Sequence, residues 1–161
     1  MLGTFQDESS FRMSDTKPLR ILMVEDNPGD VRLVKESMIE LKIKNDLFHV
    51  PDGETGLAYL RREGDFANAV LPDMVLLDLN LPGIGGRDTL AIIKSEEELK
   101  HIPVVILTSS EAEADVLRTY QLQANCYVVK PLNLDQFLTV VQSIEHFWFS
   151  IVRLPSRNSP L

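Results

Sequence analysis

Acidic, hydroxyl and amino side chains recur at the ends of short apolar runs in this sequence. They are, in chain order, Glu25, Asp26, Asp78, Thr108 and Lys130. Taken singly, each has an ordinary structural explanation: an acidic pair favours the start of a following helix, and a strand-end lysine can extend into solvent. Asp78 is harder to explain in this way, because burying a lone carboxylate in an apolar run costs several kcal/mol. The recurrence at separate run ends therefore predicts a shared site.

The chemistry that suits these groups is phosphoryl transfer assisted by a cation. Crowded carboxylates repel one another unless a cation neutralises them, and Mg²⁺ prefers carboxylate, water and phosphate oxygens. Asp78 beside such an ion can attack phosphorus and form an aspartyl phosphate. The Thr108 hydroxyl and the Lys130 ammonium would then stabilise the equatorial oxygens of the transferring group. The candidate metal ligands are Glu25, Asp26, Asp78 and the backbone carbonyl of Asn80.

The elements that must position these groups are five short apolar runs separated by helical patterns. The runs are Ile21–Val24, Leu47–Val50, Met74–Leu79, Val104–Leu107 and Tyr127–Val129. Strands that are apolar throughout and alternate with helices predict a parallel sheet covered on both faces. The carboxyl ends of parallel strands meet at one edge, which is where ligands bind in such sheets. Folding would therefore gather the candidate residues in one pocket.

Helix boundaries are marked by capping residues. Asn27 followed by Pro28 predicts the start of the first helix, and Asn133 predicts the start of the last one. A helix is expected over about residues 54–63 after the turn at Asp52-Gly53. Ser110-Glu111-Ala112-Glu113 fits a capping box, in which the first and last side chains each satisfy the other's backbone N–H.

Composition limits the classes of partner. The chain has 161 residues, with 16 Lys and Arg against 24 Asp and Glu, a net charge of −8. This charge disfavours binding to nucleic-acid phosphates or to an anionic membrane. The single cysteine, Cys126, forms no internal disulfide and fits a reducing compartment, and no apolar run reaches the ~18 residues of a membrane span. We expect a cytoplasmic domain over 19–150, a flexible leader over 1–18 and a tail over 151–161.

Over about residues 20–148 the chain resembles the receiver domains of two-component response regulators. The motifs that carry the resemblance are Val24-Glu25-Asp26-Asn27, Leu77-Asp78-Leu79-Asn80-Leu81-Pro82-Gly83, Leu107-Thr108-Ser109 and Val129-Lys130-Pro131. The resemblance implies a flavodoxin-like, doubly wound (βα)5 sandwich whose parallel sheet has the strand order 2-1-3-4-5. It also implies that a partner histidine kinase phosphorylates Asp78.

The resemblance assigns further roles around the phosphoryl site. It implies that Mg²⁺, or Mn²⁺, is bound through Asp26, Asp78 and the Asn80 carbonyl, with Glu25 completing the acidic pair. It also implies a cis peptide bond between Lys130 and Pro131, which would fix the direction of Lys130.

A two-residue switch is implied as well. Thr108 and Tyr127 match the family's switch positions: phosphate draws Thr108 inward, and Tyr127 rotates into the vacated space. The surface formed by the fourth helix, fifth strand and fifth helix would change. The protein would then be a signalling phosphoacceptor that assists its own phosphotransfer and dephosphorylation, and not an enzyme.

Two segments are similar to the small stand-alone regulators that partner cyanobacterial and other bacterial phytochromes. They are Leu60–Ala69 and Phe147–Pro155. This similarity implies a phytochrome-type histidine kinase as donor and a homodimer. The aromatic run Phe147–Phe149 and the apolar residues after it either cover the receiver itself or meet a partner chain. Since about 13 residues follow Trp148, we expect the output to be contact with an unknown downstream protein or a phosphorelay.

Two other functions would use the same fold or a similar set of residues. A Mg²⁺-dependent aspartyl-phosphate phosphohydrolase usually has a second Asp two residues after the nucleophile, and that position here is Asn80. A phosphate-independent binding module would have no need for the complete set of acidic, hydroxyl and amino groups. His49, His101 and His146 show no ligand spacing and receive no role.

Overall fold

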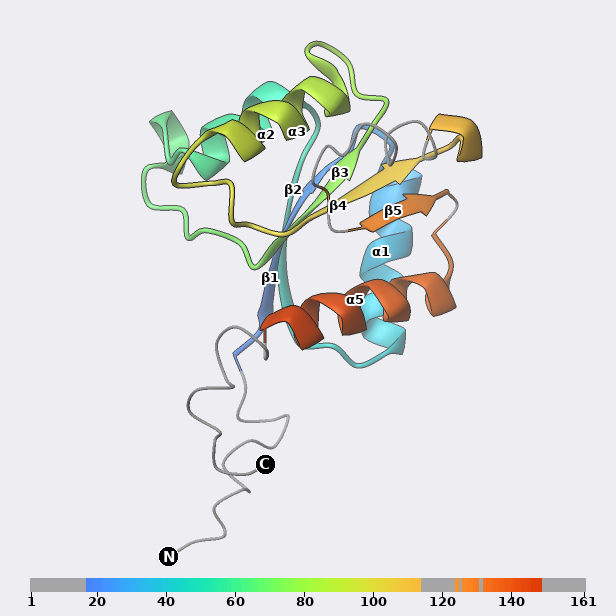
Figure 1. The fold of residues 1–161 in the computed structure, drawn as a ribbon. Coiled ribbons are helices and arrows are strands. Elements are labelled where there is room, and N and C mark those ends of the chain that lie inside the picture. Colours follow the sequence, from blue (N-terminus) through green and yellow to red (C-terminus); the bar gives the residue numbers. More distant parts are fainter. Residues whose placement is uncertain (1–16, 114–123, 125, 131, 149–161) are drawn as a thin grey trace, which may run out of the picture.

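Five parallel strands form the centre of the computed structural model, which describes residues 17–113, 124, 126–130 and 132–148 (Figure 1). The elements are β1 (Leu19–Val24), α1 (Pro28–Glu40), β2 (Asn45–Val50), α2 (Gly53–Leu60), the 3-10 helix η3 (Gly64–Phe66), β3 (Met74–Asp78), α3 (Gly85–Ser95), β4 (Val104–Thr108), β5 (Cys126–Val129) and α5 (Leu134–Trp148). The strand order is β2-β1-β3-β4-β5. The predicted fold class and strand order are therefore confirmed.

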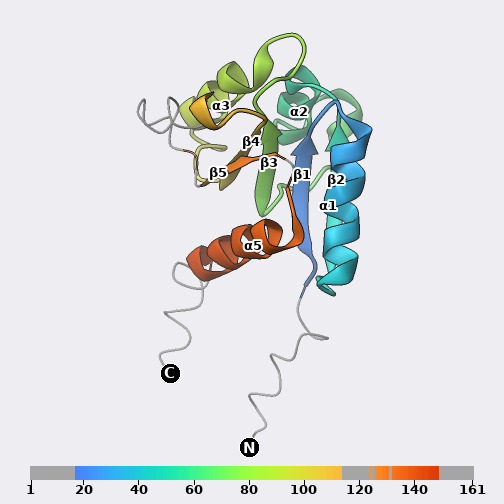
Figure 2. The ribbon, with the colours of Figure 1, turned by 90° about the vertical axis from the view of Figure 1, so that its right-hand side faces the viewer.

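Helices cover both faces of the sheet, as Figures 1 and 2 show. α2 and α3 pack on one face through a cluster that includes Leu57 and Leu90. α1 and α5 pack on the other face through a cluster that includes Val34 and Phe137. Every residue of β3 and β4 is buried, because side chains alternate between two covered faces. This explains why these strands are continuous apolar runs.

The helix starts follow their predicted caps. The Asn27 side chain accepts a hydrogen bond from the Gly29 N–H at 2.8 Å, and Asn133 accepts one from the Gln136 N–H at 2.7 Å. α2 ends at Leu60, three residues before the predicted position, because the chain turns into the left-handed region at Arg62 with φ of 57°. β2 begins at Asn45, two residues before the apolar run that predicted it.

Several sequence predictions fall on residues outside the described part. These are most of the leader, the helix after Glu113, the peptide bond to Pro131, and the segment from Phe149 to the tail. Among the described residues, no helix combines the length and the apolar character needed to cross a membrane. The division into leader, domain and tail stays a prediction.

Candidate functional site

The carboxyl ends of four neighbouring strands lie at one edge of the sheet and carry the candidate residues. The edge is pinned by backbone hydrogen bonds: the Glu25 N–H donates to Val50 O at 3.0 Å, and the Lys130 N–H donates to Thr108 O at 2.7 Å. β3 is central, between β1 and β4. Asp78 at its end therefore lies between the acidic pair after β1 and the threonine that ends β4.

Three carboxylates form an acidic cluster, which we define as Glu25, Asp26 and Asp78. One oxygen from each lies within 4.8 Å of the other two. Glu25 is 0% exposed and Asp78 is 3% exposed, whereas Asp26 is exposed to solvent. The cluster therefore has a buried floor and one solvent-facing member, so that a ligand can approach from the Asp26 side.

Lys130 extends into the acidic cluster from the end of β5. Its Nζ lies 3.0 Å from Glu25 Oε1, 2.8 Å from Asp30 Oδ2 and 3.4 Å from Asp78 Oδ1. The side chain is only 15% exposed. The structure therefore excludes the alternative in which this lysine simply extends into solvent.

Burial and mutual contact shift the pKa values of this pair. Burial raises the pKa of Glu25 from 4.5 to about 7, with the hydrogen bond from Lys130 opposing the shift and Asp78 adding to it. For Lys130, burial alone would lower the pKa, but hydrogen bonds to Asp30 and Glu25 and the charge of Asp78 raise it overall. The ammonium therefore remains charged at neutral pH, while Glu25 changes its charge close to neutrality.

The loop after β3 orients Asp78. The Asn80 N–H donates to Asp78 Oδ1 at 3.1 Å, which fixes the carboxylate by a local turn. The loop then passes close under α3, where a Cβ on Gly86 would lie 2.2 Å from the Asp78 carbonyl oxygen. Glycine is therefore required for α3 to approach the backbone of the candidate nucleophile.

Thr108 lies at the same edge but makes different contacts. It is 0% exposed, and its hydroxyl donates to Glu113 Oε1 at 3.1 Å. Thr108 Oγ1 in turn accepts a hydrogen bond from the Ser110 N–H at 3.2 Å. The predicted capping box is therefore half formed. Ser110 Oγ accepts a hydrogen bond from the Glu113 N–H at 3.2 Å, but the Glu113 carboxylate accepts one from the Thr108 hydroxyl and not from the Ser110 N–H.

Tyr127, the second switch residue, lies in β5 opposite Ile106 of β4. It is half-buried and packs against the cluster of apolar residues beneath α2 and α3. Its predicted role and that of Thr108 stay predictions, as does the cis bond before Pro131.

The acidic cluster fits a hard divalent cation. All of its side-chain donors are carboxylate oxygens, the ligand type that Mg²⁺ and Mn²⁺ prefer. Glu25 Oε1 is buried without a hydrogen bond, although it lies within ion-pair distance of Lys130. A cation between these carboxylates would neutralise the negative charge that the single ammonium of Lys130 leaves uncompensated. This donor set supports the prediction of Mg²⁺ or Mn²⁺ as cofactor.

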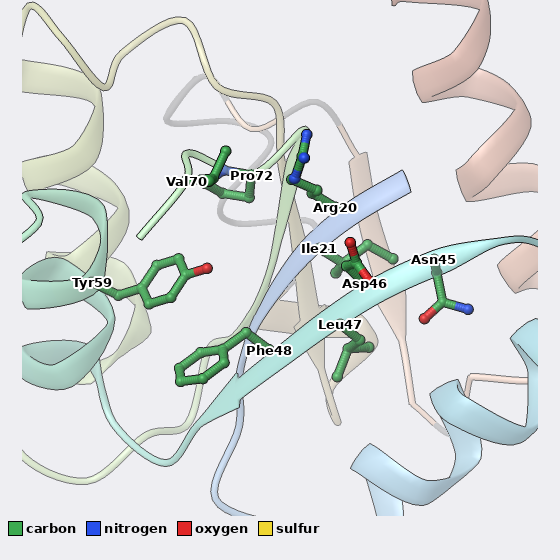
Figure 3. Close-up of a pocket in the computed structure, with 9 residues that line it drawn as sticks. All are labelled: Arg20, Ile21, Asn45, Asp46, Leu47, Phe48, Tyr59, Val70 and Pro72. Atoms are coloured by element: carbon green, nitrogen blue, oxygen red, sulfur yellow. The ribbon is translucent and has the colours of Figure 1, made fainter. Parts of the chain in front are cut away.

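A cavity of about 370 Å³ lies elsewhere, by the first residues of β1 and β2. In Figure 3, Phe48 and the hydroxyl of Tyr59 border it on one side, and Arg20 lies beside Val70 and Pro72 on another. Its lining holds none of the candidate site residues. This cavity is therefore separate from the candidate residues at the carboxyl ends of the strands.

Three contacts at the carboxyl edge were missed by sequence reasoning. They are Asp30 to Lys130, Glu113 to Thr108, and His49 Nε2 to the Glu25 carbonyl oxygen at 2.6 Å. The position of Asp30 in the first turn of α1 was a usable signal, because a helix that follows β1 begins at this edge. His49 has no such signal, since it depends on the pairing of β1 with β2.

Comparisons with known proteins agree with this geometry. A family model described as the response regulator receiver domain matches residues 21–142. The chain is 44% identical over 146 residues to response regulator Rcp1 of Synechocystis sp., covering 89% of this chain and 99% of that protein. Two similar solved structures are of response regulators, one phosphorylated and one with bound Mn²⁺.

The first is the phosphorylated cyanobacterial phytochrome response regulator RcpA, with 46% identity, a TM-score of 0.70, and coverage of 84% of this chain and 97% of that one. The second is the Mn²⁺-bound form of Rcp1, with 45% identity, a TM-score of 0.68, and coverage of 81% and 94%. The chain thus resembles phytochrome response regulators, and it belongs to the response regulator receiver domain family.

Proposed function

We propose that this protein is a two-component response regulator in which Asp78 accepts a phosphoryl group from a histidine kinase. The observation that carries the proposal is the acidic cluster with Lys130 Nζ 3.4 Å from Asp78 Oδ1. A nearly buried carboxylate beside a fixed ammonium is suited to hold a phosphoryl group whose oxygens need positive charge.

The transfer step uses the side chains as follows. An Asp78 carboxylate oxygen forms a bond to phosphorus while the phosphorus–nitrogen bond to the kinase histidine breaks. The imidazole leaves with the electron pair of that bond and takes a proton from solvent. Lys130 and Thr108 then hold oxygens of the new aspartyl phosphate, and the Asn80 N–H keeps the other Asp78 oxygen in place. Water attack on phosphorus would reverse the modification, with the protein assisting its own dephosphorylation.

Glu25, Asp26, Asp78 and the Asn80 backbone carbonyl would hold Mg²⁺ or Mn²⁺. The bound cation supplies charge that offsets repulsion between the carboxylates and the incoming phosphoryl oxygens. Thr108 and Tyr127 would couple phosphorylation to the surface formed by the fourth helix, β5 and α5.

The donor in this proposal is a phytochrome-type histidine kinase. Support comes from the 44% identity to Rcp1 and the 46% identity to RcpA, the latter named as a phytochrome response regulator. A kinase competition tests it: the protein should be phosphorylated faster by a phytochrome kinase than by an unrelated histidine kinase at equal concentration. Equal rates would contradict the assignment of the donor.

The organisation belongs to the same proposal. We infer a cytoplasmic receiver domain over 19–150 with a leader over 1–18 and a tail over 151–161. We further infer a homodimer formed through the fourth and fifth strand–helix region, with residues 147–154 contributing. The output would be contact with a downstream protein or a relay of the phosphoryl group. Sedimentation would refute the homodimer if the protein stays monomeric at high concentration in both phosphorylation states.

The test of the central proposal is intact mass after incubation with a small phosphodonor. We expect one phosphoryl adduct with Mg²⁺, none with a chelator, and none in Asp78→Asn. Asp88→Asn is the matched control, because it removes an exposed carboxylate from the first turn of α3, the helix that follows β3. An adduct that survives Asp78→Asn would mean a different nucleophile. Absence of an adduct with both a phosphodonor and a kinase would favour the phosphate-independent binding module.

A further inference from the structure

The hydroxyl of Thr108 is part of the cap of the helical residues 111–113. The Ser110 N–H donates to Thr108 Oγ1, whose own proton goes to Glu113 Oε1. The Glu113 N–H in turn donates to Ser110 Oγ. These three bonds make a closed ring into which the threonine is inserted, where an ordinary capping box would join Ser110 and Glu113 directly.

A threonine hydroxyl has one proton to donate. In the structure that proton is given to the carboxylate of Glu113, an acceptor that is negatively charged and only partly exposed. A phosphoryl oxygen on Asp78 would need the same proton. The two anions therefore compete, and Thr108 can serve one of them at a time.

We propose that Glu113 is a positioning residue that holds the Thr108 hydroxyl in the resting orientation and is displaced when Asp78 is phosphorylated. This inference rests on the proposed function. Once released from Thr108, the Glu113 carboxylate can accept a hydrogen bond from the Ser110 N–H, which completes the ordinary capping box. The helix start then has two alternative hydrogen-bond arrangements, and phosphorylation selects between them.

The size of the effect follows from the bond that is exchanged. A hydrogen bond to a charged acceptor contributes more free energy than a bond between neutral groups. Part of the free energy lost with the Thr108–Glu113 bond is regained when the Glu113 carboxylate accepts a hydrogen bond from the Ser110 N–H. Removing Glu113 should therefore favour the phosphoryl-bound state by about three- to tenfold in affinity. Glu113→Gln keeps a neutral acceptor and should give an intermediate value.

The experiment measures the affinity of the Mg²⁺-loaded protein for beryllofluoride, a phosphoryl mimic, by titration calorimetry. We expect Glu113→Ala to bind about three- to tenfold more tightly than wild type. Glu111→Ala is the control, because it removes an exposed carboxylate from the same helical turn. It should bind within about twofold of wild type, since surface charges contribute little. Urea unfolding of each variant excludes a loss of folding as the cause.

A second background separates the hydrogen bond from the charge. In Thr108→Val no hydroxyl remains, so adding Glu113→Ala should leave the affinity unchanged. An equal gain in that background, or an equal gain from Glu111→Ala, would overturn the inference in favour of simple charge repulsion. Wild-type affinity in Glu113→Ala would overturn it directly. A wild-type protein that binds no beryllofluoride would overturn the proposed function itself, and the inference with it.

Discussion

The pH dependence of stability tests the electrostatics of the acidic cluster through Glu25. Burial raises the pKa of this carboxyl from 4.5 to about 7, so the folded protein favours its protonated form. The replacement Glu25→Gln keeps the shape of the side chain and removes its charge at every pH. Comparing the two proteins across pH therefore isolates the free energy of ionising a buried carboxyl.

The sign follows from the direction of the shift. Below pH 4.5 the carboxyl is protonated in both the folded and the unfolded chain, and its contribution to stability is fully present. As the pH rises through 4.5 towards 7, the unfolded chain loses the proton first, and stability falls. A shift from 4.5 to about 7 corresponds to about 3 kcal/mol at ~1.4 kcal/mol for each pH unit.

The assay is urea unfolding of the metal-free proteins between pH 5 and pH 8. We expect Glu25→Gln to gain about 2–3 kcal/mol relative to wild type over this range, with most of the gain between pH 5 and pH 7. Glu36→Gln, which replaces an exposed carboxylate on α1, is the control. A plot of its free energy of unfolding against pH should run parallel to that of wild type. Parallel curves for Glu25→Gln and wild type would refute the reasoning, because Glu25 would then ionise alike in both states.

Two further substitutions test how the site is held. Gly86→Ala places a Cβ 2.2 Å from the Asp78 carbonyl oxygen, so we expect the free energy of unfolding to fall by about 1–3 kcal/mol in urea titrations. A loss below ~1 kcal/mol would show that α3 shifts freely to make room for the Cβ. Asp30→Asn removes the 2.8 Å partner of Lys130 and should lower stability by about 1 kcal/mol at pH 8, as measured in the same way. Unchanged stability would show that Glu25 and Asp78 alone hold the lysine.

The fold and the edge that carries the site were predictable because they depend on local patterns. β3 and β4 are buried on both faces, so their sequences are continuous apolar runs, and the polar residues at their ends stand out. Once the sheet is parallel, the placement of Asp78 near Glu25 and Asp26 follows from topology. The resemblance to receiver domains then supplied the strand order, which periodicity alone does not determine.

The contacts that sequence reasoning missed depend on side-chain direction across elements. Lys130 and Asp30 are 100 residues apart and meet only because β5 ends near the first turn of α1. The half-formed capping box is a different kind of miss. Ser110 and Glu113 have the right residue types and spacing, but the Glu113 carboxylate accepts its hydrogen bond from the Thr108 hydroxyl. A sequence motif specifies which bonds are available, and the packed structure decides which of them form.

The resting structure already satisfies both groups that are proposed to hold the phosphoryl oxygens. Lys130 is held by the carboxylates of Glu25 and Asp30, and Thr108 is held by Glu113. The two are not equivalent, because an ammonium has three protons and a hydroxyl has one. Lys130 can turn one proton towards a phosphoryl group while keeping another carboxylate, whereas Thr108 must leave Glu113 completely. In the proposed function, the discrete structural change therefore falls on Thr108 and on the helix start that it caps.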